Sequence, residues 1–173
     1  MAVETVEEAK TSVEQWLKEN GHDVNVVEDN NASFHYEIDY PLGSMKKQRI
    51  IQPKEYPGLV VLLNGVGVAE EHKDKLKELS EDDTDTFHNF IRKAFIFAEN
   101  SYDMNTTDEG VIDQIQFSYE FYTDALTKTK LYRGLLLNHR ALIYIVTIFN
   151  EKFGVPAMPE ENTGAEQNPC SAN

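Results

Sequence analysis

Two glycines, Gly65 and Gly67, follow an apolar run at 59–63 and precede a charge-rich segment, which is where a dinucleotide-binding loop would begin. The G-x-G-x-x-G pattern needs a third glycine at position 70, and this chain has Glu70 there. A carboxylate at that point would repel a pyrophosphate and keep the backbone from approaching it. The glycines therefore fit better a strand end or a bulge that needs small residues.

The acidic and histidine residues do not have the spacing of a metal site. Counted from Asp83, an EF-hand calcium loop needs glycine at its sixth position and glutamate at its twelfth, where this chain has His88 and Ala94. No two histidines lie four residues apart, as the zinc-binding H-E-x-x-H motif requires. We expect the acidic run at 80–85 to cap a helix, and we predict no metal and no cofactor.

Nucleophilic catalysis has little support in the sequence. The G-x-S-x-G motif of the α/β-hydrolases is missing, so we predict no catalytic residue and no enzymatic activity. The alternative is a small-ligand-binding protein or an enzyme whose polar groups converge only in the folded chain. Its structural sign would be a deep pocket lined by several of the following residues: His35, Tyr36, Glu37, Asp39 and Tyr119.

The clearest basic cluster spans 45–49 and contains Lys46, Lys47 and Arg49. Lysine and arginine on an edge hairpin more often prevent edge-to-edge pairing of sheets than bind a ligand. We therefore interpret this cluster as protection of a sheet edge.

The charge of the chain restricts its partners. Sixteen Lys and Arg stand against thirty Asp and Glu, which gives a net charge of −14 at pH 7. Such a surface repels phosphate backbones and anionic lipid head groups, so we expect no nucleic-acid and no membrane partner. The N-terminus lacks the basic start and apolar run of a signal peptide, and the single cysteine, Cys170, excludes an intramolecular disulfide. We predict a cytoplasmic protein.

The elements that must position these residues follow from the apolar periodicity. Thr5 and Glu8 have the spacing of a capping box at the start of an amphipathic helix that Gly21 ends. We expect helices at 5–20, 69–79, 80–100 and 127–153, and strands at 24–28, 34–40, 49–52, 59–63, 102–107 and 115–121. This order predicts an α+β domain over 5–154: an antiparallel sheet with an N-terminal helix, a middle helical segment and a long C-terminal helix (α-β-β-β-α-β-β-α).

Three segments carry a family resemblance: V-E-E-A-K-T-S-V-E-Q-W-L, S-F-H-Y-E-I-D-Y and F-S-Y-E-F-Y-T-D-A-L-T-K. With the order of the elements, they resemble an archaeal domain-of-unknown-function family with the type III secretion chaperone-like fold. The resemblance covers about 5–154 and brings no catalytic residues. It implies a homodimeric, non-enzymatic module, whose secretion relatives bind proteins by exposed apolar surface or by strand addition.

The last helix supports a homodimer independently. A helix packed on one side of a sheet needs an apolar stripe only about 100° wide, and apolar residues at 135–137 and 142–146 exceed it. A second copy would cover the excess, so we expect the chain to bind itself and, as a further partner, an extended protein segment. The expected dimer or partner surface comprises Phe90, Phe95, Leu136, Ile143, Tyr144 and Ile148.

The segment 155–173 has no apolar periodicity and no basic residue, so we expect a disordered tail. We predict that a chain ending at Gly154 has the same melting temperature as the full chain, within error, in a differential scanning calorimetry experiment. A clear fall in the melting temperature would show that the tail packs on the domain.

Overall fold

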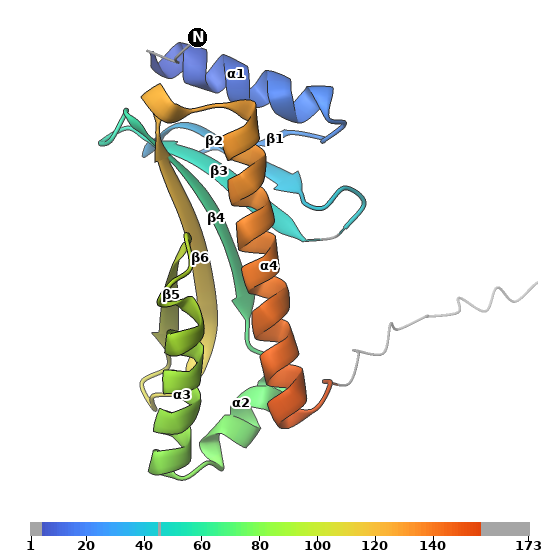
Figure 1. The fold of residues 1–173 in the computed structure, drawn as a ribbon, viewed down its shortest axis with the longest axis vertical. Coiled ribbons are helices and arrows are strands. Elements are labelled where there is room, and N and C mark those ends of the chain that lie inside the picture. The colour runs from blue at the N-terminus through green and yellow to red at the C-terminus, as the bar shows by residue number, and fades with distance from the viewer. Residues whose placement is uncertain (1–4, 45, 157–173) are drawn as a thin grey trace, which may run out of the picture.

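The computed structural model describes residues 5–44 and 46–156 (Figure 1). Helices and strands follow in the order α1 (Val6–Glu19), β1 (Asn25–Val26), β2 (Ala32–Asp39), β3 (Lys47–Pro53), β4 (Leu59–Gly67), α2 (Glu70–Lys77), α3 (Glu81–Phe95), β5 (Ser101–Thr106), β6 (Ile112–Tyr122) and α4 (Lys128–Phe153), with a 3-10 turn at Thr123–Ala125. The strands form one antiparallel sheet in the order β1-β2-β3-β4-β6-β5. The predicted α+β class is confirmed. Apart from Val155 and Pro156, the predicted tail lies outside the described residues.

The helices α1, α3 and α4 lie on one face of the sheet, as Figure 1 shows. Period-two alternation in β2 places Phe34, Tyr36 and Ile38 on this covered face, where each is buried. His35 and Glu37 therefore lie on the opposite face, which none of these three helices covers. The sheet thus has one face in the core and one face without these helices, which we call the polar face after its β2 residues. In β3 and β4 the same face carries the half-buried Ile51, Val61 and Leu63.

The long helix α4 connects two apolar clusters. Leu131 and Leu135, in its first half, pack with α1 and β2, whereas Ile145 and Phe149, in its second half, pack with α2, α3 and β6. Because one continuous helix contributes to both clusters, its placement fixes the position of the two ends of the molecule relative to each other.

A glycine allows α4 to approach the sheet closely. A Cβ atom at Gly134 would lie 2.5 Å from Leu62 Cδ1 and 2.6 Å from Tyr119 Cδ1, distances that real Cβ atoms do not adopt. Two fully buried amides then tie the helix to the sheet: Asn138 Nδ2 donates to the Leu62 carbonyl at 3.0 Å, and Gln48 Nε2 donates to the Leu135 carbonyl at 2.9 Å. These bonds satisfy carbonyl groups in the core and define the position of α4 along the sheet.

The C-terminal end of α4 is held by α2. Lys75 Nζ donates to the Phe153 carbonyl, and His72 Nε2 lies 2.7 Å from the Gly154 carbonyl oxygen. A cation at the C-terminus of a helix interacts favourably with the helix dipole, and the last carbonyls have no partner within the helix. The contacts explain why α2 packs where α4 ends.

We predict that Gly134→Ala lowers the free energy of unfolding by about 1–3 kcal/mol, because the added methyl group overpacks against Leu62 and Tyr119. Helix propensity alone would make the alanine variant more stable than the glycine protein. A loss of stability therefore indicates that the close contact with the sheet outweighs helix propensity. Gly58→Ala is the control, since its Cβ would meet no atom within 4 Å. Urea denaturation of both variants measures the difference, and a more stable Gly134→Ala protein would contradict the prediction.

Candidate functional site

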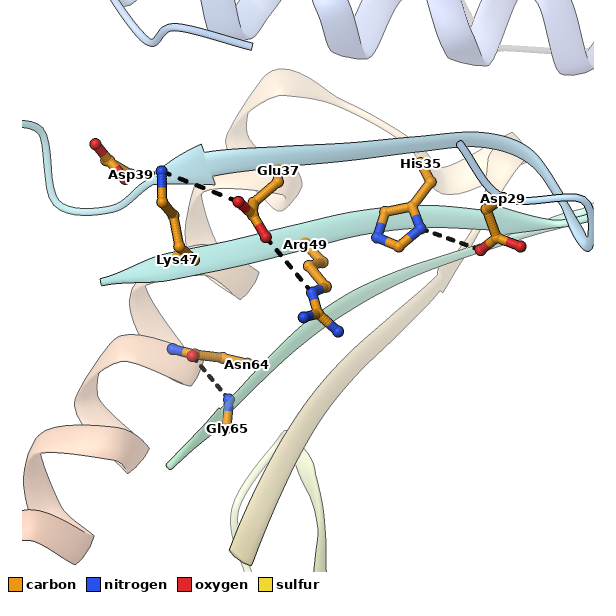
Figure 2. Close-up of polar contacts among 8 residues, drawn as sticks. All are labelled: Asp29, His35, Glu37, Asp39, Lys47, Arg49, Asn64 and Gly65. Atoms are coloured by element: carbon orange, nitrogen blue, oxygen red, sulfur yellow. Dashed lines mark hydrogen bonds and ion pairs between the residues drawn. The ribbon is translucent and has the colours of Figure 1, made fainter. Parts of the chain in front are cut away.

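Strands β3 and β4 separate at one end of the sheet. They pair from Ile51 and Val61 to Arg49 and Leu63, after which β4 continues to Gly67, paired with β6. Lys47, at the beginning of β3, pairs with β2 instead. Figure 2 shows the two strands diverging toward Lys47 and Gly65. We call this region the strand fork.

A cavity of about 420 Å³ lies in the strand fork. Its lining comes from the start of β3, the end of β4, the facing part of β6 and the middle of α4: Lys46, Lys47, Arg49, Leu63, Asn64, Gly65, Val66, Gly67, Gln114, Gln116, Leu142 and Val146. The structure therefore joins two sequence motifs, the basic cluster at 45–49 and the glycine pair, that sequence analysis treated separately. The lining includes three basic side chains and no acidic one.

Asn64 occupies the inner part of the strand fork. Its side chain is only 6% exposed, and its Oδ1 accepts the Gly65 N–H at 2.8 Å (Figure 2). Because only the amide oxygen can accept this bond, the second polar atom of the side chain is Nδ2. Nδ2 has no hydrogen-bond partner in the described part of the chain. Continuing the register of β3 would place Lys47 opposite Gly65, which shows that β3 has moved away from this edge of β4.

Acidic side chains on the polar face partly neutralise two of the three cations. Asp39 Oδ1 lies 2.7 Å from Lys47 Nζ, and Glu37 lies 4.0 Å from Lys47 Nζ and 3.7 Å from Arg49 Nε (Figure 2). The hydrogen bond that Lys47 Nζ donates to the Asp39 carboxylate raises the pKa of Lys47. Lys46 makes none of the ion pairs found among the described residues. Burial lowers the pKa of His139, and the charge of Lys46 adds to this effect, so both favour the neutral imidazole.

Of the five residues that would mark a deep pocket, His35 and Tyr36 line a common hollow of about 320 Å³, and the other three do not join them. Glu37 and Asp39 lie on the polar face with Lys47, and His35, on the same face, lies 3.1 Å from Asp29 instead. Tyr36 is buried on the other face and donates to Glu14 Oε2 at 3.1 Å, and burial raises its pKa. Tyr119 packs under Gly134. The five residues thus do not form the pocket that would have favoured the ligand-binding alternative.

One motif escaped the sequence analysis. Ser44 and Lys47 have the S-x-x-K spacing of some serine acyl-transfer enzymes. In the fold, Ser44 Oγ accepts the Lys46 N–H at 3.4 Å, while the Lys47 ammonium group bonds Asp39. These contacts direct the lysine away from the serine, so the pair does not have the geometry of a nucleophile and its base.

Within residues 5–44 and 46–156, no group of three or more His, Cys, Asp and Glu side chains is arranged to hold a metal ion. Among the helices of this part of the chain, none has the length and hydrophobicity to cross a membrane.

The six residues of the expected dimer surface fall into two groups. Phe90, Leu136, Ile143 and Tyr144 are 37–51% exposed on the outer side of α3 and α4. Phe95 and Ile148 are 7% and 6% exposed, because the chain itself covers them. Phe95 packs on Tyr102, Phe117 and Tyr144 rings, and Ile148 lies in the same apolar cluster. We call the four exposed residues the helical face. Phe95 and Ile148 lie beneath it, in the apolar core.

Comparisons with known proteins place the chain in an uncharacterised group. The family model described as "Uncharacterized conserved protein (DUF2299)" matches residues 9–149. None of the curated proteins matches the chain. A crystal structure of an uncharacterized protein from Methanothermobacter thermautotrophicus is similar over 84% of this chain and 99% of its own, with 24% identity and a TM-score of 0.78.

A second crystal structure, YbjN from E. coli, a protein proposed to be a transcription regulator, is similar over 85% of this chain and 96% of its own. The identity is 9% and the TM-score is 0.50, so the likeness concerns the fold alone. YbjN has a type III chaperone-like fold, which agrees with the fold that the resemblance implied.

We predict that Phe95→Ala lowers the free energy of unfolding by about 3–5 kcal/mol, because it leaves a cavity among aromatic rings. Phe97→Ala is a matched control two residues away, since Phe97 is 95% exposed. Its effect should be about 0.5 kcal/mol or less. Equal losses in thermal denaturation would show that Phe95 is not packed as described.

Proposed function

This chain belongs to the family of uncharacterized conserved proteins DUF2299, and from that premise we propose that it is a non-enzymatic, homodimeric protein-binding module of the secretion-chaperone-like type. The observation that carries the proposal is the helical face, where four large apolar side chains remain exposed in the single chain. Apolar patches of this kind, rimmed by polar groups, commonly mark protein interfaces.

The helical face is built across two antiparallel helices. Near the start of α3 and the end of α4, a hollow of about 330 Å³ is lined by Phe87, Phe90 and Ile148 and rimmed by Asp83, Glu151 and Lys152. Farther along, the Phe95 and Tyr144 rings meet edge to face at 6.0 Å. An apolar hollow with a charged rim has the composition expected of an interface core and its surroundings.

The spacing on α4 suits a two-fold contact. Leu136 and Ile143 lie seven residues apart, which is two helical turns, so both project from one line along the helix. When two copies of a helix cross about a two-fold axis, the same residues serve both sides of the contact. We infer that α4 of a second copy covers this line.

A partner protein would use a different part of the molecule. The sheet ends at β5, whose outer edge pairs with no other strand of the described chain. An extended segment can add to such an edge through main-chain hydrogen bonds. We propose β5, Ser101–Thr106, as the strand that accepts an extended protein segment, and this role leaves the helical face free for the second copy.

The ligand-binding alternative also has one specific observation in its favour. The cavity in the strand fork is lined by basic side chains and by the buried amide of Asn64, whose Nδ2 has no hydrogen-bond partner among the described residues. This cavity does not involve the exposed residues of the helical face, so the two functions are compatible.

We predict that Ile143→Asp converts the dimer to a monomer that keeps its fold, because a carboxylate at a 44% exposed position disturbs the contact and not the core. Ile148→Asp should unfold the chain, since Ile148 is buried. Tyr56→Asp, in the exposed turn before β4, adds the same charge elsewhere and should leave the dimer intact.

Sedimentation equilibrium at concentrations of about tens of micromolar, a range where even weak specific dimers form, measures the mass of each variant. Circular dichroism reports the fold. A wild-type protein with the mass of one chain throughout this range would overturn the proposed homodimer.

A further inference from the structure

The strand fork carries features that a dimer does not need. We propose that its cavity binds a carboxylate group attached to a small apolar body, either a free organic acid or the C-terminus of a peptide. The proposal does not rest on the homodimer, since the exposed residues of the helical face are not among those that line the cavity.

The charge of the lining selects an anion. Lys46, Lys47 and Arg49 reach the cavity, whereas Glu37 and Asp39 compensate two of these charges from the polar face of the sheet. Among the described residues one positive charge therefore remains uncompensated, in a chain whose net charge is −14. A concave site with the opposite sign to the rest of the surface focuses the field and attracts anions.

The buried amide supplies a specific hydrogen-bond donor. Asn64 Nδ2 has no partner among the described residues, while its Oδ1 is occupied by the Gly65 N–H. Leaving a buried donor unsatisfied is unfavourable, and such groups in folded proteins normally find an acceptor. Nδ2 itself has almost no solvent-accessible surface and lies on the α4 side of the sheet, whereas Lys47 and Arg49 lie on the polar face. A carboxylate oxygen that enters between β3 and β4 therefore satisfies Nδ2 only if the side chains around Asn64 move to admit it.

The two glycines keep the strand edge open. A Cβ at Gly67 would meet no atom within 4 Å, so a side chain there would extend into free space at the cavity. A Cβ at Gly65 would already lie 3.3 Å from the Ile115 carbonyl oxygen. With β3 moved away and no side chains at 65 and 67, a ligand can approach the backbone of β4 closely.

The remaining lining indicates what is attached to the carboxylate. Leu142 and Val146 from α4, with Leu63 and Val66 from β4, give the cavity an apolar part. A volume of about 420 Å³ falls within the usual range for small-molecule sites, roughly 300–1,000 Å³. The planar guanidinium group of Arg49 matches a carboxylate, and the apolar part disfavours a compact, multiply charged phosphate.

The test is an NMR titration of the full-length, ¹⁵N-labelled chain with four probes: hexanoate, hexanamide, N-acetyl-Ala-Leu with a free C-terminus, and the same dipeptide as its C-terminal amide. We expect saturable shifts of the Asn64 side-chain NH₂ signals with one or both acids and none with the amides. The acid that binds more tightly identifies the source of the carboxylate. Lack of binding by both acids, or equal binding of acids and amides, overturns the proposal.

Variants locate the site. Lys46→Gln removes the cation that makes no ion pair within residues 5–44 and 46–156, and we expect the dissociation constant to rise by about tenfold or more, the usual range for a lost charged hydrogen bond. Gly67→Val should fill the open edge and abolish binding. Lys130→Gln, on the exposed start of α4, is the control with the same charge change. If Lys46→Gln and Lys130→Gln weakened the affinity equally, the acid would be responding to the overall charge of the protein and not to this cavity, which would contradict the proposal.

Discussion

The close approach of α4 to the sheet at Gly134 is the constraint on which the rest of the structure depends. Without a side chain at this position, the helix can lie directly on Leu62 and Tyr119, where the buried amides of Asn138 and Gln48 fix it lengthwise. Because α4 contributes to both apolar clusters, this placement sets the positions of α1 at one end and of α2 and α3 at the other.

The same placement creates both candidate surfaces. One side of α4 brings Leu142 and Val146 to the strand fork, where they form the apolar part of the cavity. The adjacent side brings Ile143 and Tyr144 to the helical face. Two successive residues, Leu142 and Ile143, therefore serve different surfaces. The apolar circumference of α4 is thus divided among the core, the cavity of the strand fork and the helical face.

Sequence patterns predicted most of the fold because helix caps, helix ends and strand alternation each depend on residues close together in the sequence. The capping box of Thr5 and Glu8 is present, Gly21 has the positive φ that ends α1, and alternation in β2 gives the buried and polar faces. The strand predicted at 24–28 is shorter, only Asn25–Val26, because it pairs with β2 alone at the edge of the sheet.

The strand fork could not be predicted in this way. Lys46 and Gly65 belong to segments whose distance in space depends on the register of β3 and β4, and no local pattern fixes where the two strands separate. For the same reason the sequence does not distinguish the exposed Phe90 from the buried Phe95, because both lie on one broad apolar stripe of α3. Only Phe95 packs on Phe117 and Tyr144, and that packing buries it. Periodicity identifies apolar positions, whereas contacts between distant elements decide which of them stay exposed.

The most direct test of the account is a distance measurement between copies by pulsed electron paramagnetic resonance. With Cys170 replaced by serine, a spin label at Arg140→Cys lies on the outer side of α4 between Leu136 and Ile143 without removing an apolar contact. A label at Glu55→Cys, in the exposed turn after β3, is the comparison. The account predicts a defined, short distance between labels at 140 and a longer one at 55. An absent signal at 140, or a shorter distance at 55, would show that the helical face is not where two copies meet.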